Sequence, residues 1–398
     1  MEKRTVEDID VAGKTVLVRV DFNVPFEPGS LEIRDDSRIE ASLPTIRFLR
    51  DRRCRVVLCS HIGRPKGRVV EKMRMRPATR RLSERLGGSV IEAADCIGPE
   101  VEEIVRGLPE AGVAMLENLR FHPGEEANDL QFASALASLA SVYVNDAFGT
   151  AHRAHASTEG VTRYLPAVAG FLLARELQML GRALESPERP FTAVLGGAKV
   201  SDKIKVLKNL AKRADTLIVG GGMGTTFLKA EGLDVGSSAV EDDEVAMAAE
   251  LITLARSGGP ELLLPVDVVV ADSFQEDATT QTVDATDIPP GWMVMDIGPR
   301  TAEKFAAALK QSRTVLWNGT MGVFEWASFA AGTRAVANTL AALDYATTVV
   351  GGGSTAEAVS SLGLAGRMTH VSTGGGASLE FLEDKVLPGV AALMDKKA

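Results

Sequence analysis

Short β-branched runs alternate with amphipathic segments along most of the chain, and this alternation limits the possible fold more than any other feature. In the first half, four runs are expected to form strands: Thr15–Val20, Arg55–Cys59, Val113–Glu117 and Ser141–Asn145. The segments between them are expected to form helices: Ser42–Arg53, Ala78–Leu86, Val101–Arg106 and Leu130–Leu139. Strands that alternate with helices are typical of a parallel sheet. The continuous apolar runs indicate strands that are covered on both faces.

The alternation stops at a long helical stretch, residues 169–184, which is followed by the breaker sequence ESPERP at residues 185–190. It then restarts with six expected strands: Phe191–Leu195, Thr216–Val219, Glu261–Pro265, Val268–Val270, Thr314–Trp317 and Thr347–Val350. A chain of 398 residues is long enough for two domains. We therefore expect an α/β protein with two doubly wound, Rossmann-like parallel sheets. The first domain is expected at residues 1–169, a bridging helix and linker at 170–188, and the second domain from residue 189.

The charge balance argues against some classes of partner. The net charge is −9, which disfavours general binding to nucleic acid or to a membrane surface. Most of this charge lies beyond residue 165, and the first part contains four of the five histidines and a basic run at Lys72–Arg85. That run could be an ordinary solvated surface or part of an anion-binding region.

Several features favour a cytoplasmic protein. The chain has no run of eighteen apolar residues, and residues 1–14 lack the apolar core of a signal peptide. The three cysteines, Cys54, Cys59 and Cys96, form no CxxC pair, which fits a reducing compartment.

Four glycine-rich segments follow expected strands in the second half. They are residues 195–199 (LGGAK), 220–222, 351–353 and 374–376. Glycine allows the backbone to approach a phosphate closely, and the helix that follows offers unpaired N–H groups. Glycine also forms ordinary tight turns, but four such loops in one domain predict a nucleotide or phosphate site.

The sequences of these loops argue against the two most common classes of nucleotide-binding motif. The chain has no GxxxxGK[ST] motif, and GxGxxA at residues 351–356 lacks an acidic residue about 20 positions later. Lys199 and Lys203 are four residues apart at the start of an expected helix, so we expect them on one face, where they would suit a polyanion. The alternative is a solvated basic face that continues through Lys205 and Lys208.

In the first half, charged and polar side chains follow successive expected strands. Asp21 and Asn23 follow the first strand, His61 and Arg64 the second. Arg120 follows the third and Arg153 the fourth, and Arg38 lies in the sequence DDSR. Each arginine alone could be a surface ion-pair partner. Their recurrence after parallel strands predicts one rim that binds a small anion, because guanidinium groups match carboxylate and phosphate oxygens. His122 and His152 are expected to be structural.

These motifs together resemble the phosphoglycerate kinase family. The resemblance is carried, in the family's order, by VRVDFNVP (18–25), DDSRIEASLPTI (35–46), SHIGRPKG (60–67), LENLRFHPGEE (116–126), VNDAFGTAHRAHAST (144–158), LGGAKVSDKI (195–204), WNGTMGVFE (317–325), GGGSTAEAV (351–359) and STGGGASLE (372–380). It implies two similar domains with a cleft between them. The first binds 3-phosphoglycerate and the second, residues 189–378, binds ADP or ATP with Mg²⁺. Residues 379–398 are expected to return to the first domain.

The resemblance also implies roles for individual residues. The phosphoglycerate would be held by Asp21, Asn23, Arg38, His61, Arg64, Arg120 and Arg153. The nucleotide would be held by Lys199, Lys203, Gly221, Asn318, Glu325, Gly351, Gly352, Gly353, Ser354 and Thr355, with Glu325 on the ribose. Catalysis would depend on Arg38, Lys199, Lys203 and Gly375, through domain closure and neutralisation of the moving phosphoryl group. The expected partners are these small molecules, with no nucleic acid and no membrane, and we expect a monomer.

Two positions depart from the pattern of the family. Thr320 stands where relatives usually carry proline, and Ser354 where they usually carry the aspartate that helps to hold magnesium. Ser354 or Thr355 could supply a hydroxyl ligand instead, and Glu357 could hold a metal-bound water. Ser354 is also the feature that keeps one alternative open, a nucleotide-binding relative with weakened catalysis and a regulatory role. A second alternative is a kinase for another small carboxylate, but the arginines argue against it because they fit a phosphate as well as a carboxylate.

Overall fold

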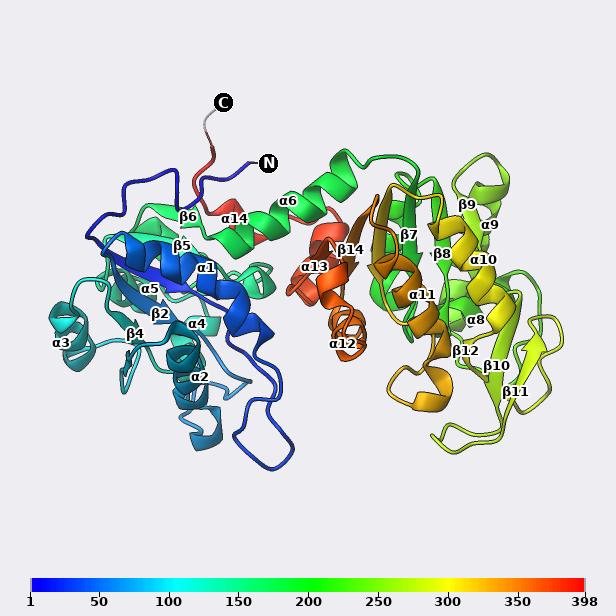
Figure 1. The fold of residues 1–398 in the computed structure, drawn as a ribbon, viewed down its shortest axis with the longest axis horizontal. Coiled ribbons are helices and arrows are strands. Elements are labelled where there is room, and N and C mark those ends of the chain that lie inside the picture. Colours follow the sequence, from blue (N-terminus) through cyan, green and yellow to red (C-terminus); the bar gives the residue numbers. More distant parts are fainter. Residues whose placement is uncertain (1, 397–398) are drawn as a thin grey trace. The chain divides into compact units, whose positions relative to one another are not determined.

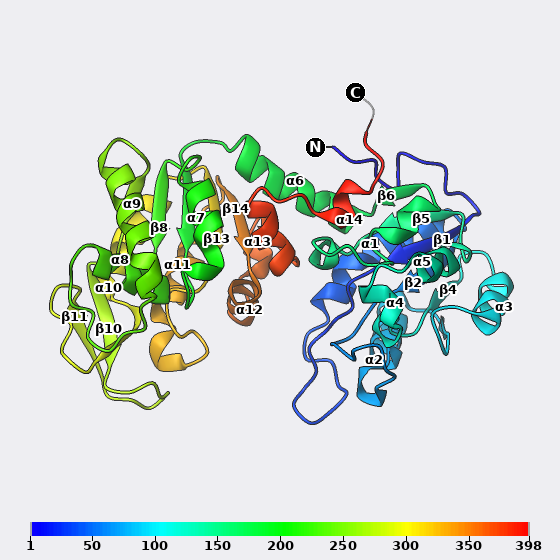
Figure 2. The same cartoon turned by 180° about the vertical axis from the view of Figure 1, so that it is seen from behind.

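The computed structural model describes residues 2–396, which divide into two compact units. The first unit runs to Gln178 and takes in the chain again from Val386. The second unit runs from Met179 to Lys385. The boundary falls within helix α6 (Phe171–Glu185), and each unit is described by itself (Figures 1 and 2).

The first unit is built on a six-stranded parallel sheet with the order β3-β4-β2-β1-β5-β6. Its strands are β1 (Thr15–Arg19), β2 (Arg55–Cys59), β3 (Val90–Glu92), β4 (Val113–Met115), β5 (Val142–Asn145) and β6 (Ala167–Ala169). From β1 the chain moves to one side through β2, and β5 and β6 lie on the other side. This reversal between β1 and β5 is the place where doubly wound sheets bind ligands.

Helices cover both faces of this sheet. They are α1 (Ser37–Asp51), α2 (Arg76–Leu86), α3 (Pro99–Gly107), α4 (Pro123–Glu126) and α5 (Leu130–Ala137), with short 3₁₀ turns η1 (Glu71–Met73), η2 (Leu119–Phe121), η3 (Phe148–Thr150) and η4 (Gly160–Arg163). Figure 1 shows α1 and α2 on one face, and Figure 2 shows α4 and α5 from the opposite side. The core beneath α1 joins Ile39, Ile46 and Leu49 to the strand residues Val18 and Val56.

The two ends of the chain meet in the first unit. Lys3 pairs with Asp395 in a β-bridge, and the buried Lys3 ammonium donates to the carbonyl of Leu393 at 2.9 Å. After α14 (Pro388–Ala391), Met394 N–H donates to Ala167 O on the edge strand β6. Residues up to Lys385 stay with the second unit, because helix α13 (Gly376–Leu382) is held there by the Asn209 side chain, which donates to Leu382 O.

The second unit contains a second six-stranded parallel sheet, with the order β15-β14-β13-β7-β8-β9. Its strands are β7 (Phe191–Leu195), β8 (Thr216–Val219), β9 (Glu261–Leu263), β13 (Thr314–Asn318), β14 (Thr347–Gly351) and β15 (His370–Val371). The strand order reverses between β7 and β13. The core joins Val194, Val315 and Trp317 of the sheet to Phe305 and Val336 of two covering helices.

Seven helices that lie wholly within residues 179–385 belong to the second unit. The helices of this unit are α7 (Ile204–Leu210), α8 (Gly221–Ala230), α9 (Val245–Arg256), α10 (Pro299–Leu309), α11 (Ala331–Ala341), α12 (Gly353–Ser361) and α13. The 3₁₀ turns are η5 (Ser201–Lys203), η6 (Asp242–Glu244), η7 (Ala327–Phe329) and η8 (Ala365–Arg367). Helices α8, α12 and α13 each begin directly after a glycine-rich loop.

The fold class is the expected one, with one correction. The expected strand Val268–Val270 belongs to β10 (Asp267–Ala271), which lies outside the parallel sheet. It is the centre of a three-stranded antiparallel sheet with β11 (Thr280–Asp284) and β12 (Met293–Ile297). The prediction was wrong because a short apolar run reads the same way in a parallel and in an antiparallel strand. None of the helices in the described part of the chain is both long and apolar enough to cross a membrane.

Candidate active site

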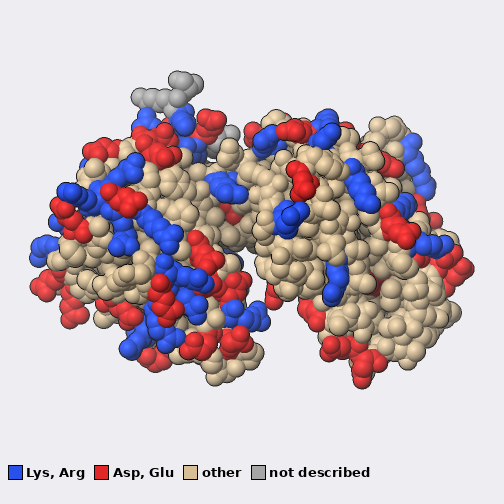
Figure 3. Space-filling view, in the orientation of Figure 1, with Lys and Arg blue, Asp and Glu red and all other residues tan. Residues whose placement is uncertain are grey.

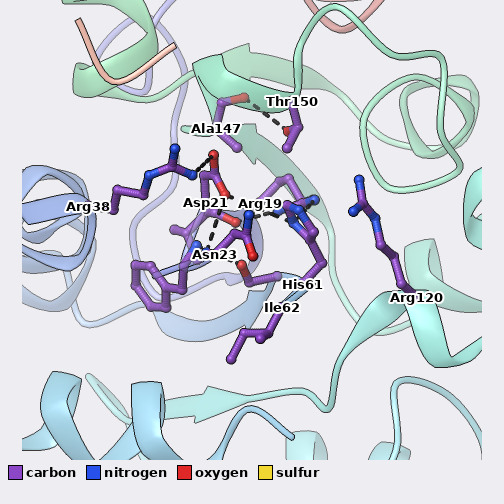
Figure 4. Close-up of polar contacts among 12 residues, drawn as sticks. Arg19, Asp21, Asn23, Arg38, His61, Ile62, Arg120, Ala147 and Thr150 are labelled. Carbon is purple, nitrogen blue, oxygen red and sulfur yellow. Dashed lines mark hydrogen bonds and ion pairs between the residues drawn. The ribbon is translucent and has the colours of Figure 1, made fainter. Parts of the chain in front are cut away.

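A cluster of charged side chains lies at the carboxyl ends of β1 and β2 in the first unit (Figure 4). Arg38, on the first turn of α1, donates to the Asp21 carboxylate at 2.8 Å. His61 Nδ1 lies 4.0 Å from the other oxygen of Asp21. Asp21 and His61 are buried, and the Arg38 side chain is about one-third exposed. The arginine therefore has an anion-pairing head group that remains partly open to a ligand.

His61 is held in its neutral form. Burial lowers the pKa of His61 well below its ordinary value, and the nearby charges of Arg19, Arg120 and Arg38 lower it further. Arg19 approaches His61 Nδ1 at 3.2 Å, and a guanidinium can only donate, so Nδ1 is the acceptor. The proton of the neutral ring is then on Nε2, where it can be donated to an oxygen of a bound anion.

Arg19 is a site residue that the sequence analysis missed. It is fully buried at the end of β1, and its Nε donates to the Ser157 hydroxyl at 2.9 Å. Ser157 in turn donates to the buried Glu125 carboxylate at 2.6 Å. The available signal was a charge inside an otherwise apolar strand, which is rare unless the charge is paired. Arg19 positions His61 through this buried network.

The loops around the cluster are tied together by polar side chains. Asn23 accepts from Gly63 N–H at 2.8 Å, and Arg120 donates to Gly63 O at 2.8 Å. Asn118 donates to Ile62 O at 2.8 Å and accepts from the Arg120 backbone. The segments after β1, β2 and β4 are thus joined at one edge of the sheet, and Figure 4 shows Arg120 and Arg38 on different sides of His61.

The remaining arginines differ in exposure. Arg120 is 4% exposed and Arg64 is exposed. Burial lowers the pKa of Arg120, although an arginine stays charged at neutral pH. Arg153 is half-buried, and its Nε lies 3.2 Å from His152 Nε2. His152 therefore contacts a candidate ligand residue.

The basic run Lys72–Arg85 is largely neutralised by nearby carboxylates. Arg80 pairs with Glu32 at 3.1 Å, and Arg85 pairs with Asp36 at 2.7 Å. Arg74 pairs with both Glu71 and Glu117. On the face drawn in Figure 3, basic and acidic side chains are accordingly mixed over the first unit. Of the two interpretations of this run, the structure favours an ordinary solvated surface.

In the second unit, Lys203 occupies the point where the strand order reverses. Its Nζ donates to Gly196 O, after β7, at 2.7 Å and to Asn318 O, at the end of β13, at 3.1 Å. Burial lowers the pKa of Lys203 to about 8, with a small opposing effect from Asp202. The amine is therefore fixed between the two central strands, in an environment that favours a bound negative charge.

The glycines near Lys203 allow the loops to interlock. Gly221 has a φ of +63°, and a Cβ there would lie 2.7 Å from Thr320 O and 2.9 Å from Gly197 N. Gly197 N–H donates to Thr320 O at 2.8 Å. The backbones that follow β7, β8 and β13 are therefore in direct contact, which no side chain at Gly221 would permit. Thr320, one of the two departures from the family pattern, serves here through its backbone.

Asn318 and the loop after β14 form the neighbouring part of the edge. The Asn318 side chain is 1% exposed, and its Nδ2 has no hydrogen-bond partner among the residues that the structure describes. A Cβ at Gly352, which has a φ of +90°, would come within 3.2 Å of this nitrogen. A buried donor without a partner is costly, and a ligand oxygen would satisfy it.

The first turn of α12 presents different side chains in different directions. Ser354 is exposed, whereas Thr355 is buried and its hydroxyl oxygen accepts from Gly319 N–H at 2.7 Å. Thr355 thus already connects the β13 and β14 loops. Ser354 and Glu357 are the exposed oxygen-bearing side chains at this helix end. Gly375 precedes α13 with a φ of +49°, and Glu325 is exposed on the loop after β13.

The expected common face of Lys199 and Lys203 is wrong. Helix α7 begins only at Ile204, and Lys203 ends the 3₁₀ turn η5. Lys199 is exposed and lies before both elements. The turn is held instead by Glu241, whose carboxylate accepts from Ser201 N–H at 2.9 Å. Burial acts to raise the pKa of Glu241, but hydrogen bonds from Ser201 and Val200 leave it lowered overall. This residue, 40 positions from the turn, could not be connected to it by spacing.

Comparison with known proteins now identifies the family. The family model described as "Phosphoglycerate kinase" matches residues 6–385. The chain belongs to the phosphoglycerate kinase family. It is 58% identical to a relative named phosphoglycerate kinase from Moorella thermoacetica over 396 residues, covering all of both chains. A relative of the same name from Pelotomaculum thermopropionicum is also 58% identical over 396 residues, again covering all of both chains.

Solved structures of the phosphoglycerate kinase family support the same assignment. The structure of the Coxiella burnetii protein matches with a TM-score of 0.87 at 39% identity, covering 98% of both chains. The Pyrococcus horikoshii protein matches with a TM-score of 0.85 at 35% identity, covering 98% of both chains. The chain is thus a phosphotransferase with a carboxyl group as acceptor, and nothing in these findings favours the regulatory alternative.

Proposed function

We propose that this chain transfers a phosphoryl group reversibly between 1,3-bisphosphoglycerate with ADP and 3-phosphoglycerate with ATP, as a glycolytic enzyme. The observation that carries the proposal is Lys203, which is fixed by Gly196 O and Asn318 O at the reversal point of the second sheet. The first unit would take the phosphoglycerate and the second unit the nucleotide.

On the acceptor side, the proposed ligands are Asp21, Asn23, Arg38, His61, Arg64, Arg120 and Arg153. Neutral His61 and buried Arg120 would donate to substrate oxygens, and the more exposed Arg64 would add charge at the rim. Asp21 has a different role, because a carboxylate cannot bind an anion. It would orient Arg38 and accept a hydrogen bond from the substrate hydroxyl.

On the nucleotide side, Lys203 and the loop amides near Gly221 and Gly351–Thr355 would hold the phosphates. The unpartnered amide of Asn318 supports a bound ligand at this edge. Exposed Lys199 would reach the phosphates from the rim, and Glu325 would bind the ribose. Gly375 would contribute backbone amides at the transfer point.

Catalysis would depend on alignment and charge. Arg38 would approach the moving phosphoryl group from one side, with Lys199 and Lys203 on the other. Because phosphoryl transfer requires acceptor and donor in line, the two units would have to close on each other during the reaction. Closure would also exclude water, which could otherwise hydrolyse the nucleotide or the acyl phosphate.

Magnesium would arrive with the nucleotide, and exposed Ser354 is the protein group proposed to touch it. A neutral hydroxyl suits a metal that keeps most of its ligands from phosphates and water. When bound, the ion would neutralise phosphate charge and orient the terminal phosphate. Thr355 is a weaker candidate ligand, because its oxygen already accepts from Gly319.

We also propose that the chain acts as a monomer in the cytoplasm. Each set of ligand residues lies within one unit of the chain, so neither needs a second copy. The three cysteines are free and buried, which fits a reducing compartment. Sedimentation of the purified protein tests the monomer.

A coupled assay with 3-phosphoglycerate and Mg-ATP tests the reaction. In Arg38→Ala, the maximal rate should fall by about 10³ or more, since a charge-stabilising arginine can contribute that much. Binding of 3-phosphoglycerate should weaken far less. Arg80→Ala is the matched control, because Arg80 pairs with Glu32 on the surface. A rate within tenfold of the wild type in Arg38→Ala would show that Arg38 does not act at the transfer point.

A further inference from the structure

A group of metal-ligating side chains lies in the first unit outside the proposed active site. Asp95 and Cys96 follow β3, and His122 lies between η2 and α4. One oxygen of Asp95, the Cys96 sulfur and a ring nitrogen of His122 all lie within 4.8 Å of one another. The proposed kinase reaction uses none of these three side chains.

The backbone around the three side chains is already ordered. Ala93 N–H donates to Met115 O, and Glu117 N–H donates to Asp95 O, which fixes the end of β3 beside β4. The His122 ring stacks on Phe132 with the ring centroids 4.9 Å apart. His122 Nε2 contacts Asp95 Oδ1 at 2.5 Å. Two chain segments 27 positions apart are therefore held together at this place.

The three side chains differ in their access to solvent. Cys96 is fully buried, and its thiol donates to Glu117 O at 3.0 Å. The side chains of His122 and Asp95 are 27% and 53% exposed. The thiol thus forms a floor, and the imidazole and carboxylate form a rim through which an ion can enter.

We propose that Asp95, Cys96 and His122 bind one Zn²⁺ ion. Sulfur, imidazole and carboxylate are the ligand types of zinc, whereas Mg²⁺ prefers oxygen alone. A thiolate and a carboxylate would balance the charge of the ion, and water would complete four-coordination.

The ligand atoms need only small movements. Zinc bonds of about 2.0–2.3 Å in a tetrahedron place the ligand atoms roughly 3.3–3.8 Å apart. The contact between His122 and Asp95 must open by about 1 Å on this basis. The exposed Asp95 side chain must then also lengthen the hydrogen bond that its Oδ1 accepts from Cys96 N–H at 2.6 Å. The Cys96 sulfur must exchange its contact with Glu117 O for the ion.

Binding must also remove a proton. Burial raises the pKa of the Cys96 thiol well above its ordinary value, so the thiol is protonated in the absence of an ion. Metal binding releases that proton, and the zinc affinity is therefore expected to increase with pH. An occupied site would fix the turn that carries Arg120 to the end of β3.

The test is metal titration of the tag-free, reduced full-length chain without nucleotide or substrate. Isothermal titration with Zn²⁺ should give one site, and Co²⁺ should give the near-ultraviolet charge-transfer absorption of a thiolate ligand. Cys96→Ser should lose this absorption, and the zinc affinity should fall by about 10–100-fold or more. The measurement involves no catalysis, so its outcome is independent of the proposed kinase reaction.

Cys54→Ser is the matched control, because Cys54 is also buried and its thiol also donates to a backbone carbonyl at 3.0 Å, that of Val11. It should bind Zn²⁺ and Co²⁺ as the wild type does. If Cys96→Ser does not fold, the zinc affinity of Asp95→Asn and of His122→Asn is measured instead, and it should also fall. Equal zinc binding by the wild type and the folded ligand variants, or no binding by the wild type, would overturn the proposal. The contact between Asp95 and His122 would then be an ion pair that only joins two loops.

Discussion

Lys203 illustrates how far a residue's chemistry depends on its surroundings. Its sequence neighbours predicted a lysine on an open helix face, but its amine lies between two carbonyl oxygens of the central strands. Burial disfavours the positive charge, whereas the nearby Asp202 carboxylate favours it. Burial is the larger effect and lowers the pKa of Lys203 to about 8.

This pKa predicts that nucleotide binding is coupled to proton uptake. Near pH 8 about half of the free protein has a neutral Lys203, and bound phosphates favour the charged form, so binding should take up about half a proton. The uptake should disappear below about pH 7, where Lys203 is already charged. Calorimetric titration with ADP, in buffers that differ in ionisation heat, measures it.

The matched variants are Lys203→Met and Lys208→Met. Lys208 is exposed on α7, 3.9 Å from Glu250, so its replacement should leave the proton uptake at pH 8 unchanged. The same uptake in Lys203→Met would assign the titrating group to another residue.

Ser354 gives a second prediction for a single residue. Its side chain is exposed at the start of α12, so an aspartate would fit there without steric conflict. Ser354→Asp should lower the magnesium concentration needed for the half-maximal rate, because a carboxylate is a stronger ligand than a hydroxyl. Glu357→Gln serves as the control for the alternative ligand one turn later. Identical magnesium titrations of Ser354→Asp and the wild type would show that this position is not a metal ligand.

At the level of elements, the sequence predicted best the strands whose side chains are buried on both faces. β2, β7 and β8 have the expected bounds, and all of their residues except the first of β2 are buried. Helix α1 begins at Ser37 instead of Ser42 and continues through Pro44. Its first turn is stabilised by buried Ile39 and by the pair of Arg38 with Asp21, a tertiary contact that local sequence does not contain.

The candidate site shows the same limit. The alternation of strands and helices predicted Asp21 and His61, because both follow strands, whereas Asn318 was predicted only from the family resemblance. Arg19 contacts His61 over 42 positions through a buried hydrogen bond. Glu241 holds the turn that contains Lys203 over 40 positions. Contacts between residues so far apart in the sequence depend on how the sheet packs, and residue spacing in a motif does not predict them.

The buried carboxylate of Asp146, which follows β5, accepts hydrogen bonds from the first turn of helix α6. Asp146 Oδ1 accepts from Leu172 N–H at 2.9 Å and from Leu173 N–H at 3.3 Å. Burial raises the pKa of Asp146 to about 6, although these amides and Thr45 oppose the shift. The folded state therefore holds a proton more tightly than the unfolded chain. The stability that Asp146 contributes is present at low pH and is lost as the pH rises through about 6.

The direction of this change in stability with pH can be measured with the variant Asp146→Asn. The difference in unfolding free energy, wild type minus variant, should decrease by about 2 kcal/mol between roughly pH 4 and pH 7. Urea unfolding followed by circular dichroism gives the values. Asp267 is the matched control, because it accepts from Thr301 N–H at the start of α10 at 2.7 Å.

Asp267 should show the opposite slope. Burial acts to raise its pKa, but hydrogen bonds from Thr301 and Arg300 leave it below the ordinary value. Its contribution is therefore present above the unfolded pKa and lost as the pH falls, so the difference for Asp267→Asn should increase with pH. A flat profile for Asp146→Asn would mean that the pKa of Asp146 is the same in the folded and the unfolded state.

On the scale of the whole molecule, the first unit is not a continuous piece of sequence. Buried Lys3 donates to Leu393 O and pairs with Asp395, and Asn145 donates to Gly389 O. A chain that stops at residue 178 would keep Lys3 but lose these partners. We therefore expect such a chain to be unstable.

Restoring the returning segment should rescue the shortened chain. Residues 1–178 joined to residues 386–398 by a flexible glycine–serine linker should fold, because residues 386–398 supply the partners of Lys3 and the contact of Met394 with Ala167. This chain should bind 3-phosphoglycerate but not ADP, and it should not catalyse transfer. Calorimetric titration with each ligand tests which unit binds which substrate.

Arg120→Ala in the joined chain provides the control, since it should weaken 3-phosphoglycerate binding by about 10–100-fold, the value of a charged hydrogen bond. Tight ADP binding by the joined chain would assign part of the nucleotide site to the first unit.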